Sequence, residues 1–223
     1  MPVRDDGTSA KVSKESTVIT QPKVPPAHVQ DKNSVNISIT FPQIEGGFPD
    51  VWGLNEELDI ECRISDYRER EMPELKMKVH ISLADRTLLE TETGGYHKIS
   101  DKYTEKGTLS VTGDFPGNKE YRAEKVRRKI RIVDYREEIV ALFNSFVDFI
   151  QEQGTKITMG STPRRIESSI LNSYSGIDKA VLSNITTCFE VANYSTHKVS
   201  RRDYEDIYLS IQEIKQFCER GNE

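Results

Sequence analysis

The sequence predicts an α+β protein of two domains, an antiparallel β-sandwich followed by a C-terminal bundle of about four α-helices. Between residues 34 and 134, apolar and polar residues alternate in short runs, as they do in antiparallel strands that bury one face. From residue 135 onwards the apolar residues recur at every third or fourth position, which is typical of amphipathic helices. The predicted segments are therefore a disordered tail or linker (1–33), a β-sandwich (34–134) and a helical domain (135–223).

The first 33 residues are polar, contain prolines at 22, 25 and 26, and show no apolar period. A segment of this composition buries too little apolar surface to offset the entropy of ordering the chain. This is why the sequence predicts a tail there.

Four runs give clear strand predictions: "SVNISITF" (34–41), "ELDIECRIS" (57–65), "ELKMKVHISLA" (74–84) and "KVRRKIRIV" (125–133). Weaker strands are expected near 87–92, 95–100 and 108–113, and the turn signals "EGGFPD", "TGG" and "FPGN" separate the strands. About seven short strands in roughly 100 residues fit a β-sandwich better than a parallel fold.

The last of these strands is basic on one face, which carries Lys125, Arg127, Lys129 and Arg131. This pattern predicts either a polyanion site or a solvated outer face that protects an edge strand, with Glu61 or Asp59 as cross-strand acids. The net charge of -5 favours the second interpretation, and it predicts that nucleic acid is not a partner.

The helical period begins directly after this strand. In "YREEIVALFNSFVDFIQEQG" the apolar residues follow a helical repeat, with Asp134 and Glu137 as the start signal and Gly154 as the stop signal. Because no linker separates the last strand from this helix, we expect the two domains to have a fixed mutual orientation.

Three more helices are predicted. The first has Thr162 as its N-cap and Pro163 in its first turn. The next spans 177–194, and the last opens with a capping box of Ser200 and Asp203. The stretch "FEVANYSTHKVSRRDYEDIYLSI" (189–211) therefore predicts an antiparallel helical hairpin with its turn at 195–199.

The reactive residue types form no recognisable catalytic or metal-binding pattern. Cys62, Cys188 and Cys218 are widely spaced, and none is paired in the sequence with one of the four histidines. Cys62 falls on the apolar face of a strand, which indicates a small core residue. We therefore expect no catalytic residue, no metal and no cofactor, and a protein that is not an enzyme.

No apolar run approaches the ~18 residues that a membrane helix needs, and the first residues lack the apolar core of a signal peptide. We expect a cytoplasmic chain without a membrane span. The alternative is association with a membrane through a partner, or as part of a longer membrane protein.

Several motifs of the helical half resemble a known domain: "YREEIVALFNSF" (135–146), "STPRRIESSI" (161–170) and "FEVANYSTHKVSRRDYEDIYLSIQEI" (189–214). Their order and spacing resemble the C-terminal helical domain of unknown function in transglutaminase-like membrane proteins, especially archaeal ones. The N-terminal half resembles the immunoglobulin-like modules that accompany such proteins.

The resemblance implies partners more than chemistry. It implies membrane transglutaminase-like proteins, or the MoxR-type AAA+ ATPases and von Willebrand A-type proteins often associated with them. The catalytic transglutaminase-like domain has no counterpart in this sequence, so acyl transfer is not implied. Arg165 is a further departure, because the family usually has a glutamate at this third helical position, and a cation there opposes the helix dipole.

Two functions are expected as alternatives. The first is a non-catalytic interaction or scaffolding module associated with a transglutaminase-like or MoxR-type system. Its candidate partner-binding residues are Glu190, Tyr194, His197, Arg201, Arg202 and Tyr204, and Glu190 is expected close enough to Arg201 or Arg202 to pair across the hairpin turn. The second is a small-ligand-binding or weak hydrolase domain with a site among Tyr194, His197 and Tyr204.

Overall fold

The computed structural model describes residues 32–44 and 46–220, which belong to one compact unit, Lys32–Glu223. Strands come first in this part of the chain: β1 (Asn36–Thr40), β2 (Val51–Gly53), β3 (Glu57–Ser65), β4 (Met77–Leu83), β5 (Arg86–Thr93), β6 (Tyr96–Lys102), β7 (Gly107–Phe115) and β8 (Glu124–Val133). Helices follow: α1 (Tyr135–Glu152), α2 (Pro163–Ser173), α3 (Lys179–Tyr194) and α4 (Arg201–Arg220).

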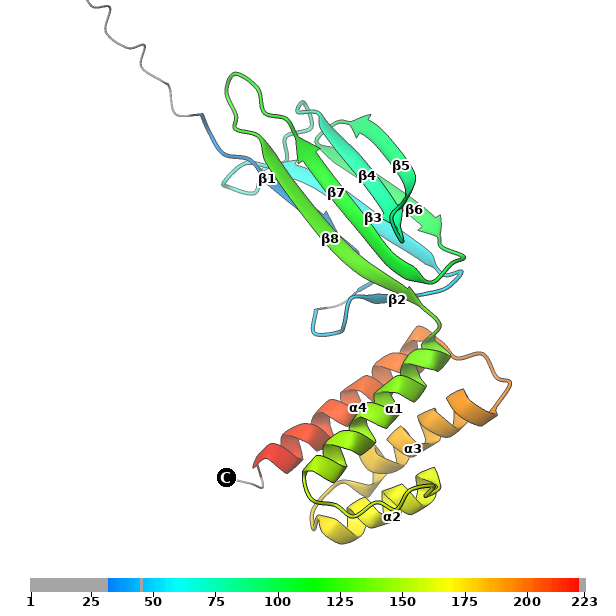
Figure 1. The fold of residues 1–223 in the computed structure, drawn as a ribbon. Helices are drawn as coiled ribbons and strands as arrows, with labels where there is room; N and C mark the ends of the chain where they lie inside the picture. Colours follow the sequence, from blue (N-terminus) through cyan, green and yellow to red (C-terminus); the bar gives the residue numbers. More distant parts are fainter. Residues whose placement is uncertain (1–31, 45, 221–223) are drawn as a thin grey trace, which may run out of the picture. The chain divides into compact units, whose positions relative to one another are not determined.

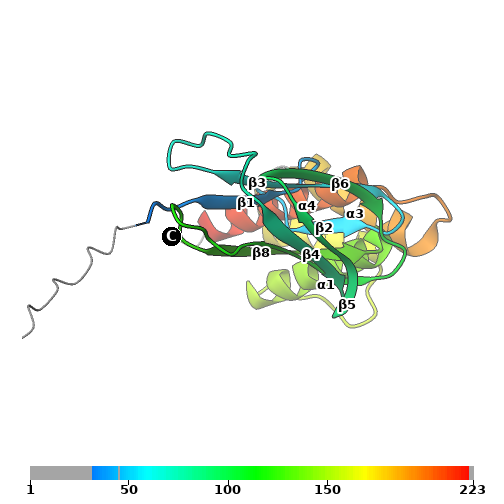
Figure 2. The ribbon, with the colours of Figure 1, turned by 90° about the horizontal axis from the view of Figure 1, so that it is seen from above.

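The strands form two sheets that are packed face to face (Figures 1 and 2). The smaller sheet has the order β1-β3-β6, and the larger has the order β2-β8-β7-β4-β5. Alternate side chains of both sheets point into one apolar core. In β3 these are Leu58, Ile60, Cys62 and Ile64, all fully buried. The alternation seen in the sequence is therefore the alternation between core and surface.

The predicted fold class needs a correction. The larger sheet is not purely antiparallel, because β2 pairs with β8 in parallel, with Val51 opposite Arg131 and Gly53 opposite Val133. The strand β2 was not predicted, since a strand of three residues is too short to show a period. Val51 and Val133 also belong to the helical core, so the two halves share buried surface. The fold is a β-sandwich with one mixed sheet, continued by four helices. The predicted limits of the halves, residues 34 and 135, stay predictions.

The predicted starts of α1, α2 and α4 are confirmed by their caps, whereas α3 begins at Lys179, two residues after the predicted start, with Asp178 as its N-cap. The Asp134 carboxylate accepts a hydrogen bond from the backbone N–H of Arg136 at 2.9 Å. At the start of α4, the backbone N–H of Ser200 donates to the Asp203 carboxylate at 2.7 Å. Gly154, with φ of 94°, follows the end of α1, where a left-handed conformation favours glycine.

The apolar faces of the helices enclose a second core. Its most buried members are Ile139, Phe146, Ile150, Ile170, Leu182, Ile185, Ala192, Ile207, Ile211 and Ile214. The predicted seam of the α3–α4 hairpin lies in this core, with Tyr204 buried and Tyr208 half-buried.

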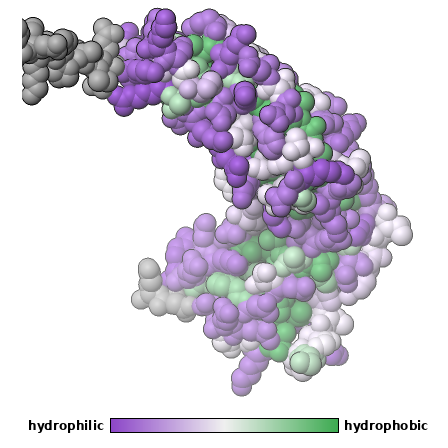
Figure 3. All heavy atoms as spheres, turned by 45° about the horizontal axis from the view of Figure 1, so that its top comes forward, coloured by the Kyte–Doolittle hydropathy of each residue, from purple (hydrophilic) through white to green (hydrophobic). Residues whose placement is uncertain are grey.

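Of the predicted tail, residues 1–31 lie outside the described residues. Asn33 forms a parallel bridge with Tyr121, and the Lys32 ammonium donates to the Asn118 carbonyl at 2.7 Å. Hydrophilic residues cover most of the visible face in Figure 3. No helix in the described ranges is both long enough and apolar enough to cross a bilayer.

Candidate functional site

The strand β2 joins the sandwich to the helices. Successive side chains of a strand point in opposite directions, so Trp52 enters the sandwich core while Val51 enters the helical core. The end of β8 divides in the same way, with Ile132 in the first core and Val133 in the second. We call β2 and the side chains packed on it the joint. It consists of packed side chains rather than a linker.

Arg201, the first residue of α4, ties that helix to the joint. Its guanidinium carbon lies 4.8 Å from the centroid of the Trp52 ring, and its Nη1 donates to the Val51 carbonyl at 2.9 Å. Its Nε pairs with Glu205 at 2.6 Å, and only 13% of its side chain is exposed. Because a planar guanidinium can stack on an indole while it donates from its edge, a single side chain makes all three contacts.

Gly53 and Tyr135 meet on the other side of the joint. A Cβ at Gly53 would lie 2.6 Å from Cε2 of Tyr135, so a larger residue does not fit without movement. Tyr135 in turn stacks on Tyr204, with ring centroids 5.6 Å apart. Burial raises the pKa of Tyr135, and it raises the pKa of Tyr204 to about 12. Both rings therefore stay protonated at neutral pH and act as packing groups.

Arg136, in the first turn of α1, fixes the turn between α3 and α4. Its Nη1 donates to the carbonyl oxygens of Val191 (3.1 Å), Ala192 and Ser195 (2.8 Å), and its Nη2 donates to that of His197 (2.6 Å). The last carbonyls of a helix have no partner within it, and they form the negative end of its dipole. The guanidinium donates hydrogen bonds to these carbonyls, and its positive charge lies at the negative end of the dipole. The predicted turn at 195–199 is confirmed, with Arg136 as its anchor.

A pocket of about 300 Å³ opens beside this turn and is lined by residues 53–56, 133–136 and 196–199. Its lining includes acidic side chains, Glu56 and Asp134, and basic ones, Arg136 and Lys198. Of the six candidate partner-binding residues, only His197 lines it.

The side chains at the end of the hairpin face solvent. Tyr194 is 69% exposed, and His197, Lys198 and Arg202 are exposed as well. The His197 Nδ1 and the Ser195 hydroxyl lie 2.5 Å apart and share a hydrogen bond. We call residues 194–198 together with Arg202 the hairpin tip. It combines a backbone held by Arg136 with outward-facing side chains.

The six candidate partner-binding residues do not form one cluster. Tyr194, His197 and Arg202 lie on the hairpin tip. Arg201 lies in the joint, and Tyr204 lies in the helical core, stacked on Tyr135. Glu190 faces α2, and the expected pair between Glu190 and Arg201 or Arg202 does not form. Instead, Glu190 pairs with Arg164 at 2.6 Å, because the α3 face that carries it packs against α2 and not against α4. Arg202 approaches Asp206 at 3.9 Å.

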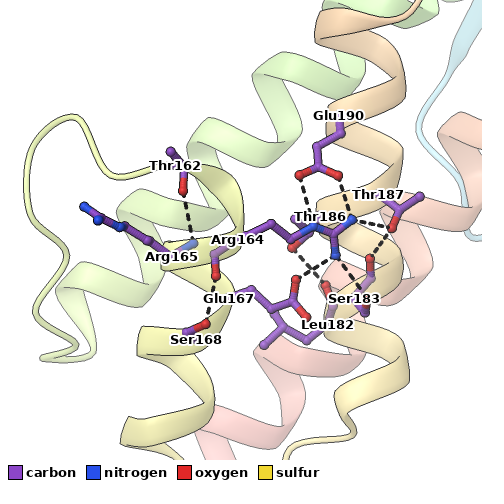
Figure 4. A network of polar contacts seen from close by, with 10 residues as sticks. All are labelled: Thr162, Arg164, Arg165, Glu167, Ser168, Leu182, Ser183, Thr186, Thr187 and Glu190. Carbon is purple, nitrogen blue, oxygen red and sulfur yellow. Dashed lines mark hydrogen bonds and ion pairs between the residues drawn. The ribbon is translucent and has the colours of Figure 1, made fainter.

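Arg164 uses all five of its N–H donors between α2 and α3 (Figure 4). It binds Glu190 through Nε (3.0 Å) and Nη2 (2.6 Å), and it binds Glu167 through Nη1 (3.0 Å). The remaining donors reach the hydroxyls of Ser183 (3.3 Å) and Thr187 (3.2 Å). These contacts are saturated within the protein, so they describe a structural link between the two helices.

The start of α2 is capped although Arg165 places a cation in its first turn. The Thr162 hydroxyl accepts a hydrogen bond from the backbone N–H of Arg165 at 3.4 Å (Figure 4). The Arg165 side chain is exposed, and an exposed charge near a helix end is well screened by water.

The cysteines are shielded from solvent to different degrees. Burial raises the pKa of the Cys62 and Cys188 thiols to about 11, and it also raises that of Cys218. A thiol with a raised pKa is protonated at neutral pH and is a poor nucleophile. Within the described ranges, no three histidine, cysteine, aspartate or glutamate side chains are grouped so that they could hold a metal ion.

Two residues were not predicted as part of the site: Trp52, which packs in the joint, and Arg136, which holds the hairpin turn. Trp52 lies in a strand too short to show a pattern. Arg136 did carry a signal, because a cation in the first turn of a helix opposes the helix dipole. In the structure its guanidinium donates to carbonyls at the end of α3 and at the turn that follows, whereas the comparable cation Arg165 in α2 faces solvent.

No protein-family model and no curated protein matches the sequence. Among solved structures, the chain is similar to the CARDB domain of a Pyrococcus furiosus protein, with 13% identity over 46% of this chain and 96% of that one and a TM-score of 0.31. The soluble domain of PmoD from a Methylocystis species gives 10% identity over 44% and 90% of the two chains, with a TM-score of 0.33.

The PKD domain of an M14-like peptidase from a Thermoplasmatales archaeon gives 12% identity over 46% of this chain and 96% of that one, with a TM-score of 0.28. Likeness at this level carries no argument for this chain, whose β-sandwich is established by its own strand pairing and core. The resemblance to immunoglobulin-like modules and to the helical domain of transglutaminase-like proteins stays a prediction.

Proposed function

We propose that this chain is a non-catalytic protein-interaction module whose contact surface is the hairpin tip. One observation supports this most directly: Arg136 holds the backbone at Ser195 and His197 while the neighbouring Tyr194 ring stays 69% exposed. A loop already fixed in one conformation loses little entropy on binding. Tyrosine is also among the residues enriched at protein interfaces.

The charge of the tip favours an acidic partner surface. The tip carries two exposed basic residues, Lys198 and Arg202, and residues 194–202 contain neither aspartate nor glutamate. Complementary charge speeds association and selects among partners. The family resemblance directs the search to a MoxR-type AAA+ ATPase, a von Willebrand A-type protein or a membrane transglutaminase-like protein. This partner assignment rests on the resemblance alone.

The test measures binding of the purified chain to each of these proteins from the same organism by biolayer interferometry. Tyr194→Ala and Lys198→Glu should each weaken binding about tenfold or more, because one removes an aromatic anchor and the other reverses a charge. Met159→Ala is the matched control, since Met159 is a fully exposed apolar residue in the loop between α1 and α2.

Binding that survives the combined Tyr194→Ala and Lys198→Glu substitution would overturn the hairpin tip as the contact surface. An equal loss in Met159→Ala would do the same, because it would show a nonspecific apolar effect. Failure of all three partner classes to bind would overturn the partner assignment.

The alternative, a small-ligand or weak hydrolase site among Tyr194, His197 and Tyr204, has less geometric support. Tyr204 lies in the helical core, while Tyr194 and His197 face solvent. Thermal-shift screening separates the two functions, since a ligand at 100 times its dissociation constant would stabilise the fold by ~2.7 kcal/mol. An interaction module should give no shift that is lost on Tyr194→Ala or His197→Ala, whereas a ligand bound elsewhere on the chain would still shift both variants.

A further inference from the structure

The outer face of the five-stranded sheet carries a second polar surface, separate from the hairpin tip. In this sheet β7 pairs with β4 on one side and with β8 on the other. Every second residue of these strands points away from the sandwich core. The outward residues near the middle of the face are His80, Ser82, Thr108, Ser110, Arg127 and Lys129, and they line a pocket of about 560 Å³.

Cations and hydroxyls form two adjacent rows across these strands. The first row runs from Ser82 through Ser110 to Lys129. The second runs from His80 through Thr112 to Arg127. Successive outward residues on one strand are ~7 Å apart, so the two cations can contact one compact group lying between the rows.

The four outward cations of β8 differ in their partners. Lys125 pairs with Asp114 at 3.0 Å, and Arg131 pairs with Glu138 at 2.5 Å. Arg127 and Lys129, which lie between them, form no ion pair with any residue in the described part of the chain. The unneutralised charge is therefore confined to the middle of the strand.

The acids expected opposite β8 are not there. Asp59 and Glu61 lie on β3 in the other sheet, where they pair with Lys98 at 2.9 Å and Arg63 at 2.7 Å. The expectation that they neutralise the basic strand was wrong, because the period of a strand does not reveal which sheet its neighbour joins.

Two features give this pocket a defined shape. The Arg127 Nε donates to the Thr112 hydroxyl at 3.2 Å, and Thr112 is itself buried, so the guanidinium is held while its outer nitrogens stay available. At the rim, the turn between β4 and β5 holds Ala84 and Asp85 at φ of 46° and 67°. Positive φ at both central residues is the geometry of a two-residue type I′ hairpin turn, so the backbone at this rim has a defined conformation.

We propose that this outer-sheet pocket binds a compact dianion of the phosphate-monoester class. Arg127 and Lys129 balance the two negative charges, and Ser82 and Ser110 donate hydrogen bonds to the oxygens. A long polyanion fits less well, because the cations on either side are already paired with acids. Asp85 at the rim and Glu90 opposite His80 place negative charge on the β5 side. The dianion is therefore expected on the β8 side of the pocket.

The test is a titration of the ¹⁵N-labelled chain followed by NMR. Inorganic phosphate and glycerol phosphate are the two probes, and they separate a free ion from an esterified ligand. Saturable shifts are expected at the amides of Ser82, Ser110 and Lys129. Arg127→Gln and Lys129→Gln should each raise the dissociation constant about tenfold or more, since each removes one charged hydrogen-bond donor.

Lys125→Gln is the matched control, because it makes the same change of charge on the same face of β8 at a cation that already has a partner. It should leave the dissociation constant within about twofold. Asp85→Asn should leave binding unchanged or tighten it. Equal losses in Lys125→Gln and Lys129→Gln, shifts that do not saturate, or stronger binding of heparin that depends equally on all three cations would each overturn the proposal.

Discussion

The joint and the contact between α2 and α3 both depend on arginine, but their arginines bind different acceptors. At the joint and the hairpin turn, Arg201 and Arg136 donate to backbone carbonyls of other elements. Between α2 and α3, Arg164 donates to carboxylates and hydroxyls, and 48% of its side chain is exposed. The first arrangement joins distant parts of the chain, and the second bridges two neighbouring helices.

This difference predicts different energies. A backbone carbonyl in a helix end or a strand already has a fixed position. A guanidinium that binds it therefore does not have to order a second side chain. An exposed ion pair gives only about 0–1 kcal/mol, because water and salt screen it and both side chains must be ordered. Substitutions in the joint should therefore cost more stability than substitutions between α2 and α3, and their cost should not depend on salt.

The largest effect is expected for Trp52→Ala. It removes a buried indole from the sandwich core and the ring over which Arg201 lies, and it should lower the free energy of unfolding by about 3–5 kcal/mol. Urea unfolding followed by far-ultraviolet circular dichroism measures it. Tyr67→Ala, at an exposed aromatic residue, is the control and should change stability little. Equal losses in the two variants would show that the joint is not a special contact.

Arg136→Met should lower the free energy of unfolding by about 2–3 kcal/mol. It removes four charge-assisted hydrogen bonds, and water replaces part of them. The loss should persist in high salt. Arg136→Lys keeps the charge but offers one ammonium in place of a planar fork, so it should recover only part of the stability. Full recovery with lysine would show that charge alone anchors the turn.

Gly53→Ala should destabilise the fold by about 1–3 kcal/mol, because the new methyl group overlaps the Tyr135 ring. The control is Gly46→Ala, where a Cβ meets nothing within 4 Å. A second substitution, Tyr135→Leu, should make Gly53→Ala less costly. A strictly additive double variant would mean that the two residues do not press on each other.

The smallest effect is expected for Glu190→Gln. It breaks the exposed pair with Arg164 and should lower stability by less than about 1 kcal/mol, with the loss shrinking as salt is added. Unfolding measured at low and high ionic strength tests this. A loss as large as that of Arg136→Met, and independent of salt, would remove the distinction between the two regions.

The features that could be predicted from the sequence are those that depend on local periodicity and on helix caps. The alternation around Ile60 and Cys62, the Thr162 cap and the capping box of Ser200 with Asp203 all lie where the pattern places them. The sequence could not indicate contacts between distant segments. The parallel pairing of β2 with β8 and the bonds from Arg136 to the end of α3 depend on how the finished elements pack.

The candidate site shows the same limit. Its exposed residues, Tyr194 and His197, were named from the sequence because one precedes the predicted turn and the other lies within it. Glu190 was assigned to the wrong partner, because a helix face can be predicted from its period while the helix that it faces cannot. Arg201 and Tyr204 were singled out as partner-binding residues, and the structure places Arg201 in the joint and Tyr204 in the helical core.

The position of Trp52 gives the protein an optical reporter of its own. It is the single tryptophan of the chain, and its ring lies in the sandwich core beneath a guanidinium that belongs to the last helix. Intrinsic tryptophan fluorescence therefore reports on a single site, the contact between β2 and the start of α4. Any partner or ligand that loosens the hold of α4 on β2 should change this emission without a label.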